Sequence, residues 1–295
     1  MNRLLVISMW MLVAVVVAAV VAVMFGRVRW KRATDQTLEA LRRSGDAAPP
    51  ADGGARAPAA PTHYDPSQLD ALPAPVARYF RTVLTPGQRF IQRALIRHDG
   101  NFARTRNQWK PFTSRQLYST APRGFVWDAS IQFLPLLPFR VRDSYQDGAG
   151  RMVGTVAGVV TVVNQQGTPG MGEASLLRYL AEAAWFPTAL LPSEGVQWTA
   201  VDDRTARATL TDRNHTVTME VYFGSGGEMA RVSANRGREV NGTVELTPWE
   251  GHFSDTLHEV DGMRIPVSGE VLWVLPKGRH SYWRGLVAEA TYEYR

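Results

Sequence analysis

The stretch DRNHTVTMEVYFGSGG, residues 212–227, decides the fold class of this chain because it reads as turn, strand and turn. Between the turn signals, Val217, Met219 and Val221 alternate with polar residues. An apolar side chain at every second position is the period of a β-strand with one buried face. Asp, Asn and Gly at both ends favour short loops to neighbouring strands. The stretch therefore predicts one strand of an antiparallel sheet.

The same pattern recurs on both sides of this strand, about ten to twelve times in all. Loops such as Asp147-Gly148 and Asn241-Gly242 favour pairing between strands that are adjacent in the sequence. The expected fold is α+β, mainly β, with a large curved antiparallel sheet that resembles a half-barrel. In the first half of the chain the expected strands lie near residues 92–103, 115–120, 124–131, 139–147 and 150–163, the last of them long and bent.

Two helices are expected to pack against this sheet. Residues 67–83 carry apolar side chains at helical spacing, and Pro73 and Pro75 are confined to the first turn. Residues 171–184 repeat leucine and alanine with the same period and end at a Trp-Phe-Pro sequence. Each helix therefore has one apolar face to bury.

The amino end carries an uninterrupted apolar run. Residues 4–25 contain no charged side chain, and as a helix they would extend about 33 Å, enough to cross a hydrocarbon core of roughly 30 Å. The run exceeds the apolar part of a secretory signal peptide, which spans about 7–15 residues. We therefore expect a retained transmembrane helix whose partner is the lipid bilayer.

Charge argues against a nucleic-acid partner and favours one side of the membrane. The net charge is +6, but five positive residues and no acid lie in residues 1–32, which leaves +1 for the rest. A nearly neutral domain lacks the basic surface that nucleic acid requires. The cations between Arg27 and Arg32 follow the apolar run, so the positive-inside rule places the domain in the cytoplasm. The chain has no cysteine, which excludes disulfides and thiolate metal sites.

Three regions follow from these patterns. Residues 1–32 form the transmembrane anchor and its basic flank. Residues 33–66 form a juxtamembrane segment, in which 34–43 keep only a thin apolar stripe, and a linker rich in Ala, Pro and Gly. Residues 67–295 form the β-rich globular domain. Because the linker cannot bury a core, we expect it to act as a flexible tether.

Several short runs in the domain resemble a bacterial family. They are LPAPVARYF at 72–80, RYLAE with WFP within 178–187, WEGHF at 249–253, RIP at 264–266, and Trp273. Over residues 69–295 the chain resembles the DUF6544 family of uncharacterised membrane-anchored proteins. That resemblance implies that the anchor lies in a bacterial inner membrane, and it implies no activity. The layout is also similar to the lipoprotein-carrier half-barrels of the LolA and LppX type, in which a curved sheet with helices inside holds acyl chains. This likeness concerns architecture alone.

Two glutamates on the second predicted helix are the catalytic candidates. Glu182 or Glu173 would act as a general acid or base in a hydrolase- or isomerase-like enzyme, with Arg236 or Tyr179 as its partner. The alternative interpretation is that Glu182 forms an ordinary surface ion pair with Arg178, four residues earlier in the helix.

No metal and no cofactor is expected. The sequence contains no zinc-protease motif, no serine-hydrolase elbow and no Walker A motif. His252 and His258 are six residues apart and would share one face of a regular strand, but no third ligand lies near them in the sequence.

The candidate ligand-binding residues are apolar and aromatic. The segment FLPLLPF, residues 133–139, holds two prolines, which argue against a central strand. It could form the lip of a ligand cavity, a patch that enters the bilayer surface, or a loop packed under the sheet edge. Tryptophans elsewhere could line the same cavity, although core packing is their ordinary role. The candidates are Phe133, Leu136, Leu137, Phe139, Tyr179, Trp185, Trp249, Trp273 and Trp283.

The leading hypothesis is a non-enzymatic, membrane-anchored domain that binds an apolar or lipid-like ligand. A curved sheet can enclose such a ligand, and the anchor keeps the domain near the bilayer. The alternatives are the glutamate-dependent enzyme and a structural or assembly factor of the envelope, which would need an exposed apolar patch and a protein partner.

Overall fold

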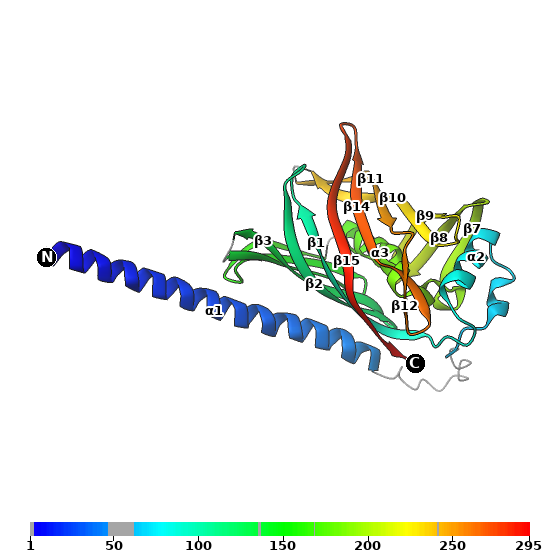
Figure 1. The fold of residues 1–295 in the computed structure, drawn as a ribbon, viewed down its shortest axis with the longest axis horizontal. Helices are drawn as coiled ribbons and strands as arrows, with labels where there is room; N and C mark the ends of the chain where they lie inside the picture. Colours follow the sequence, from blue (N-terminus) through cyan, green and yellow to red (C-terminus); the bar gives the residue numbers. More distant parts are fainter. Residues whose placement is uncertain (1–2, 47–61, 135–136, 168, 241) are drawn as a thin grey trace.

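The computed structural model describes residues 3–46, 62–134, 137–167, 169–240 and 242–295. Within them, a single curled antiparallel sheet of 13 strands has the order β6-β5-β4-β3-β2-β1-β15-β14-β11-β10-β9-β8-β7, and β12 pairs with β13 in a separate small sheet (Figure 1). The expected mainly β, half-barrel-like fold is confirmed. The described residues form 15 strands, more than expected, because residues 150–163 form a hairpin and because β12 and β13 make up a second, small sheet.

The first six strands form successive hairpins, and the last strand joins them to the second half of the sheet. Their bounds are β1 Ile91–Ala103, β2 Trp109–Thr120, β3 Arg123–Leu134, β4 Leu137–Gln146, β5 Ala149–Val156 and β6 Val160–Gln166. The later strands are β7 Val196–Asp202, β8 Thr205–Asp212, β9 His215–Phe223, β10 Met229–Val240, β11 Thr243–Phe253, β12 Leu257–Val260, β13 Met263–Pro266, β14 Ser268–Leu275 and β15 Gly278–Tyr294. Because β15 pairs with β1, the two ends of the domain lie side by side in the middle of the sheet.

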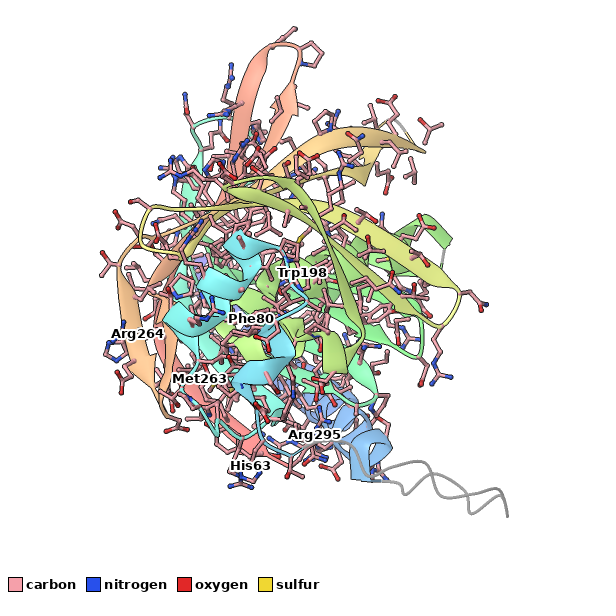
Figure 2. The ribbon with its side chains drawn as sticks, turned by 90° about the vertical axis from the view of Figure 1, so that its right-hand side faces the viewer. His63, Phe80, Trp198, Met263, Arg264 and Arg295 are labelled. Atoms are coloured by element: carbon pink, nitrogen blue, oxygen red, sulfur yellow. The ribbon has the colours of Figure 1, made fainter. Side chains whose placement is uncertain are left out.

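Helices fill the concave side of the sheet. Helix α3 (Pro169–Glu182) lies inside the curl, and α2 (Ala74–Val83) covers one end of it (Figure 1). A four-residue 3-10 helix, Pro66–Leu69, precedes α2, and three short ones follow α3, at Ala183–Trp185, Pro187–Leu190 and Pro192–Glu194. Phe80 of α2 meets Trp198 edge to face, with ring centroids 6.4 Å apart (Figure 2). One continuous apolar cluster thus runs from α2 to the sheet interior.

Three predicted elements differ from the structure. The helix expected over 67–83 is divided, because the chain turns before Pro73 and a new helix starts at Ala74. The single bent strand expected over 150–163 is the β5–β6 hairpin, whose turn holds Ala157 and Gly158 at φ angles of 54° and 78°. The segment 133–139 was expected not to form a central strand, but its described residues end β3 and begin β4. Pro138 is tolerated because it stands at the start of β4, where its missing N–H matters little.

Helix α1 (Arg3–Asp46) is the longest element. It is long and apolar enough to be a membrane anchor or a signal sequence, and its most apolar window is not buried by the rest of the chain. This N-terminal half projects beyond the sheet, whereas the C-terminal half runs along β2 and β3 (Figure 1). Residues 47–61 of the expected flexible linker lie outside the described residues.

The C-terminal half of α1 packs on the outer face of the sheet. Trp30 and Leu41 are buried there, at 5% and 1% exposure. Trp30 Nε1 donates a hydrogen bond to Asp128 Oδ1 of β3 at 2.8 Å. Arg142 Nη1 of β4 donates to Thr34 Oγ1 at 3.0 Å. The helix that follows the apolar run is therefore attached to the domain directly, and not only through the linker.

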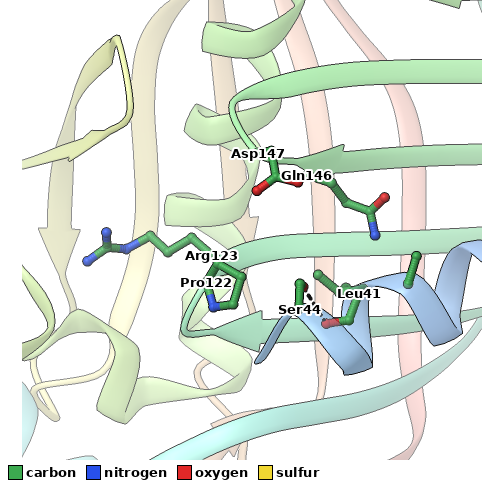
Figure 3. Close-up of a pocket in the computed structure, with 7 residues that line it drawn as sticks. Leu41, Ser44, Pro122, Arg123, Gln146 and Asp147 are labelled. Carbon is green, nitrogen blue, oxygen red and sulfur yellow. Dashed lines mark hydrogen bonds between the residues drawn. The ribbon is translucent and has the colours of Figure 1, made fainter. Parts of the chain in front are cut away.

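A small cavity remains where the end of α1 meets the sheet. It has a volume of about 50 Å³, with Leu41 and Ser44 of the helix on one side and Pro122, Arg123 and Asp147 on the other (Figure 3). A space of this size holds no more than a few water molecules. It reflects imperfect packing between helix and sheet, and it is too small for a lipid.

Candidate functional site

Arg178 is the centre of a charged network inside the curled sheet. Its Nε donates to Glu182 Oε1 at 2.8 Å, and its Nη1 donates to Asp143 Oδ2 of β4 at 2.8 Å. The guanidinium also lies over the rings of Phe125 and Trp127 of β3, 4.9 and 5.1 Å from their centroids. One cation is therefore shared by two carboxylates and two aromatic faces.

Two neutral side chains of β2 complete this network. Gln116 Nε2 donates to Glu182 Oε2 at 2.8 Å, and the Tyr118 hydroxyl donates to the same oxygen at 3.0 Å. Gln116 Oε1 in turn accepts from Arg178 Nη2 at 3.2 Å. The interpretation of Arg178 and Glu182 as a surface pair is wrong, since their side chains are only 15% and 17% exposed. The sheet curls over this face of the helix.

Burial controls the protonation of the groups around Arg178. Burial raises the pKa of Asp143, and the positive charges of Arg178 and Arg236 limit that rise. Burial and the neighbouring Glu182 carboxylate raise the pKa of the Tyr118 hydroxyl well above its ordinary value. Burial alone would lower the pKa of Arg178, but the two carboxylates outweigh it and raise that pKa. The cation is thus fixed as a permanent charge.

His98 is a second buried polar group, next to this network. Its ring lies between those of Trp185 and Trp283, with centroids 4.6 and 5.4 Å away. Neither ring nitrogen has a hydrogen-bond partner among the described residues. Burial, and secondarily the charge of Arg178, lowers the pKa of His98 from 6.5 to about 3. The imidazole therefore behaves as a neutral aromatic side chain.

The catalytic candidates are not brought together around an open site. Glu173 is exposed near the start of α3. Tyr179 is 2% exposed, and burial raises its pKa. Arg236 donates from Nε to the Ala174 carbonyl oxygen at 3.1 Å. Glu182 is the candidate that lies among polar side chains, and both of its carboxylate oxygens already accept hydrogen bonds from neighbouring donors.

Trp185 and Trp249, two of the aromatic candidates, are core residues. Trp185 is 2% exposed, and its Nε1 donates to the Pro266 carbonyl oxygen at 3.1 Å. Trp249 is 3% exposed and donates to the Tyr282 hydroxyl at 3.0 Å. Together with Tyr179 they fill the deep part of the concave face with the domain's own side chains.

The other aromatic candidates pack against the core but stay partly exposed. Trp273 stacks on Tyr282 with centroids 5.9 Å apart and ring planes inclined by 23°. Phe133 and Phe139 meet edge to face at 5.9 Å beside the β3–β4 connection. Trp283 is partly exposed as well. Leu137, at the first position of β4, is 37% exposed, and Leu136 lies outside the described residues.

A separate groove of about 390 Å³ crosses β1, β15, β14 and β11. Gly100 and Gly285 are directly paired along it. Arg284 Nε donates to Glu270 Oε1 at 2.9 Å on its wall. The charges lining the groove already pair with each other, and it lacks the apolar enclosure that a lipid-like ligand requires.

The described residues contain no group of three or more His, Asp or Glu that could hold a metal ion. His252 and His258 lie on β11 and β12, which belong to different sheets. His252 Nε2 instead contacts Glu250 Oε2 at 2.7 Å.

Three exposed valines next to the FLPLLPF segment were not predicted. Val156, Val160 and Val162 are 36%, 57% and 54% exposed. Val156 pairs with Phe139 on one side and with Val160 on the other. Valine-rich strands ordinarily indicate burial, so the sequence held no direct signal for this apolar surface.

Comparison with known proteins confirms the resemblance seen in the sequence. Residues 62–285 match the family model described as "Family of unknown function (DUF6544)". Among solved structures, the crystal structure of a β-barrel-like protein of the domain of unknown function DUF1849, from Brucella abortus, is 11% identical. That match covers 69% of this chain and 99% of the other, with a TM-score of 0.20. No curated protein matches the chain.

Proposed function

Because the chain belongs to the DUF6544 family, whose function is unknown, we propose a function from its geometry: a membrane-anchored, non-enzymatic domain that binds an apolar or lipid-like ligand. Residues 4–25 anchor it in the bacterial inner membrane. The domain stands on the cytoplasmic side, as the cations that follow the apolar run favour.

The proposal is carried by the partly exposed aromatic side chains near the hairpin ends. Phe133 and Phe139 lie beside the β3–β4 connection, and Trp273 and Tyr282 lie near the β14–β15 turn. All four pack against the core, so they are held rigidly and keep part of their surface available. Rigid, partly exposed aromatic rings are typical of sites that receive an apolar ligand.

The position of α1 supports the same proposal. The N-terminal half of α1 projects past β3 (Figure 1). An acyl chain that leaves the bilayer on this side meets Phe133 and Phe139 before any deeper residue. Because Trp185 and Trp249 already fill the deep part of the concave face, the ligand would be held near the hairpin ends.

Photo-crosslinking tests this proposal directly. The full chain is reconstituted in phosphatidylethanolamine–phosphatidylglycerol vesicles that contain a phospholipid with a diazirine on its acyl chain. After illumination, we expect lipid adducts on peptides from β3–β4 and β14–β15 in addition to α1. Adducts confined to α1 would overturn the proposal.

A matched pair of variants sharpens this experiment. Trp273→Ala removes a partly exposed ring of the proposed site, and the adducts on β14–β15 should fall severalfold. Trp109→Ala is the control, because the Arg284 guanidinium covers the Trp109 ring, with its Cζ atom 4.5 Å from the ring centroid. Equal loss in both variants would point to general destabilisation, and no loss in either would contradict the site.

A further inference from the structure

We propose that the start of β4 and the β5–β6 hairpin form a second membrane contact, seated in the headgroup region of the bilayer that holds α1. This inference rests on the proposed anchoring of α1. Its surface, here called the valine lip, consists of Leu137, Val156, Val160 and Val162. The partner is a lipid surface, and the argument begins with the depth of the lip along α1.

Close contact with α1 fixes that depth. A Cβ atom on Gly26 would lie 2.7 Å from Val159 Cγ2 and 2.9 Å from the Gly158 carbonyl carbon. Arg29 Nη2 donates to the carbonyl oxygens of Gly158 and Val159 at 3.1 and 3.0 Å. The β5–β6 turn is therefore attached to α1 at the first residue after the apolar run 4–25. Since a helix rises about 1.5 Å per residue, the turn lies within a few ångströms of the membrane boundary.

The valine lip has the apolar surface that this depth requires. Val160 and Val162 follow the turn directly and are 57% and 54% exposed. Val156 is directly paired with both Val160 and Phe139, and directly paired residues share a face of the sheet. Leu137 adds a fourth exposed apolar side chain at the start of β4. Several large apolar side chains gathered at one sheet corner mark an interaction surface, not isolated exposure.

Charge complementarity identifies lipid as the partner. Arg27 and Arg32 are exposed on α1, one and six residues after Gly26, and form no ion pair with any described residue. Lys31 is also exposed and pairs with Asp35 on its own helix. Basic side chains beside an apolar patch fit the anionic headgroup layer of a bilayer. Two separate contacts, α1 and the valine lip, would fix the tilt of the domain and hold its aromatic hairpin ends toward the membrane.

Site-specific fluorescence tests the second contact. Because the chain has no cysteine, single Cys variants at Val20, Val160 and Val201 can each carry one environment-sensitive NBD label. Val201 is a matched control, since it is 43% exposed on β7, the opposite edge strand of the sheet. The labelled full chains are reconstituted in phosphatidylethanolamine–phosphatidylglycerol vesicles that contain a nitroxide phospholipid. We expect about twofold or greater quenching at positions 20 and 160, and almost none at 201.

The outcomes separate this inference from the anchoring on which it depends. Quenching at position 20 with a water-exposed label at 160 would overturn the second contact and leave the anchor intact. A label at 160 that is shielded but not quenched by the lipid nitroxide would also overturn it, because a protein partner then covers the lip. Absence of quenching at position 20 would instead reject the anchoring.

A charge variant provides an independent readout. With the label at Leu137, the double change Val160→Glu and Val162→Glu should reduce its quenching severalfold, whereas Val201→Glu should not change it. All of these valines are exposed, so the folded domain tolerates the substitutions. Unchanged quenching in the double variant would contradict the proposal.

Discussion

Gly26 of α1 and Gly158 of the β5–β6 turn lie in backbone contact: a Cβ atom on Gly158 would lie 2.6 Å from the Gly26 carbonyl oxygen. Gly158 also has a φ of 78°, which glycine adopts without the strain that other residues incur. Both positions therefore depend on the absence of a side chain. The contact determines how far α1 stays attached to the sheet before it projects beyond it.

Gly26→Leu should loosen this attachment. The new side chain would overlap the β5–β6 turn, and overpacking of this kind costs about 1–3 kcal/mol. We expect a lower thermal unfolding midpoint in detergent and faster amide exchange at residues 157–159. Val28→Leu is the control, because Val28 is 48% exposed on the same helix. Identical exchange in the two variants would show that the contact does not hold α1 in place.

Removal of the C-terminal half of α1 should destabilise the domain. A chain of residues 26–295 keeps Trp30 and Leu41 on the sheet, whereas a chain of residues 47–295 loses both. Full burial of one large apolar side chain contributes about 1.5–3 kcal/mol. We therefore expect urea titrations to give the shorter chain a free energy of unfolding that is lower by at least about 2 kcal/mol. Equal stability would mean that α1 packs too weakly to matter.

The packing of α1 shows where prediction from the sequence ended. The apolar run and the helix beyond it could be predicted, because length and hydrophobic pattern are properties of one continuous stretch of sequence. The contact surface could not be predicted, because small residues build it together with Trp30 and Leu41. Thr34 is fully buried there, and a Cβ atom on Gly45 would lie 2.9 Å from the Ala121 carbonyl oxygen. Small residues that permit close approach leave no apolar stripe, so the segment looked like a solvated helix.

Arg178→Met should be far more destabilising than loss of an exposed arginine. It leaves Asp143 and Glu182 without their cation inside the sheet, which costs about 3–5 kcal/mol for a broken buried pair. Arg207→Met is the control, since Arg207 is 53% exposed and its pair with Glu220 contributes at most about 1 kcal/mol. Denaturant unfolding of both variants gives the difference. Similar losses would show that water reaches the network freely.

The same network marks a second limit of the sequence. The spacing of Arg178 and Glu182 correctly indicated an ion pair. Their burial could not be predicted, because it depends on β2 and β4, which lie far from Arg178 in the sequence. These strands supply Gln116 and Asp143, which hydrogen-bond with Arg178. Strand alternation gave the mainly β fold, whereas the curl that buries this face is a property of the whole sheet.

The side of the membrane can be tested with a single cysteine. Asp255→Cys lies in an exposed loop after β11, and a membrane-impermeant maleimide reaches it in intact spheroplasts only if the domain faces outward. The cations around Arg27 favour the cytoplasmic side, so we expect labelling only after lysis. Labelling before lysis, with a cytoplasmic marker protein still protected, would place the domain on the opposite side.

His98→Phe should remove part of the acid sensitivity of the domain. In the folded state the pKa of His98 is lowered from 6.5 to about 3. Below pH 6.5 the unfolded chain binds a proton that the folded chain excludes, so stability falls from pH 6.5 down to about pH 3. At pH 4.5 this amounts to about 3 kcal/mol, at roughly 1.4 kcal/mol per pH unit.

Phenylalanine keeps a ring between Trp185 and Trp283 without a titrating nitrogen. Urea unfolding at pH 7 and pH 4.5 should show a smaller loss in this variant than in the exposed-histidine control His258→Phe, and equal losses would show that His98 is protonated in the folded protein.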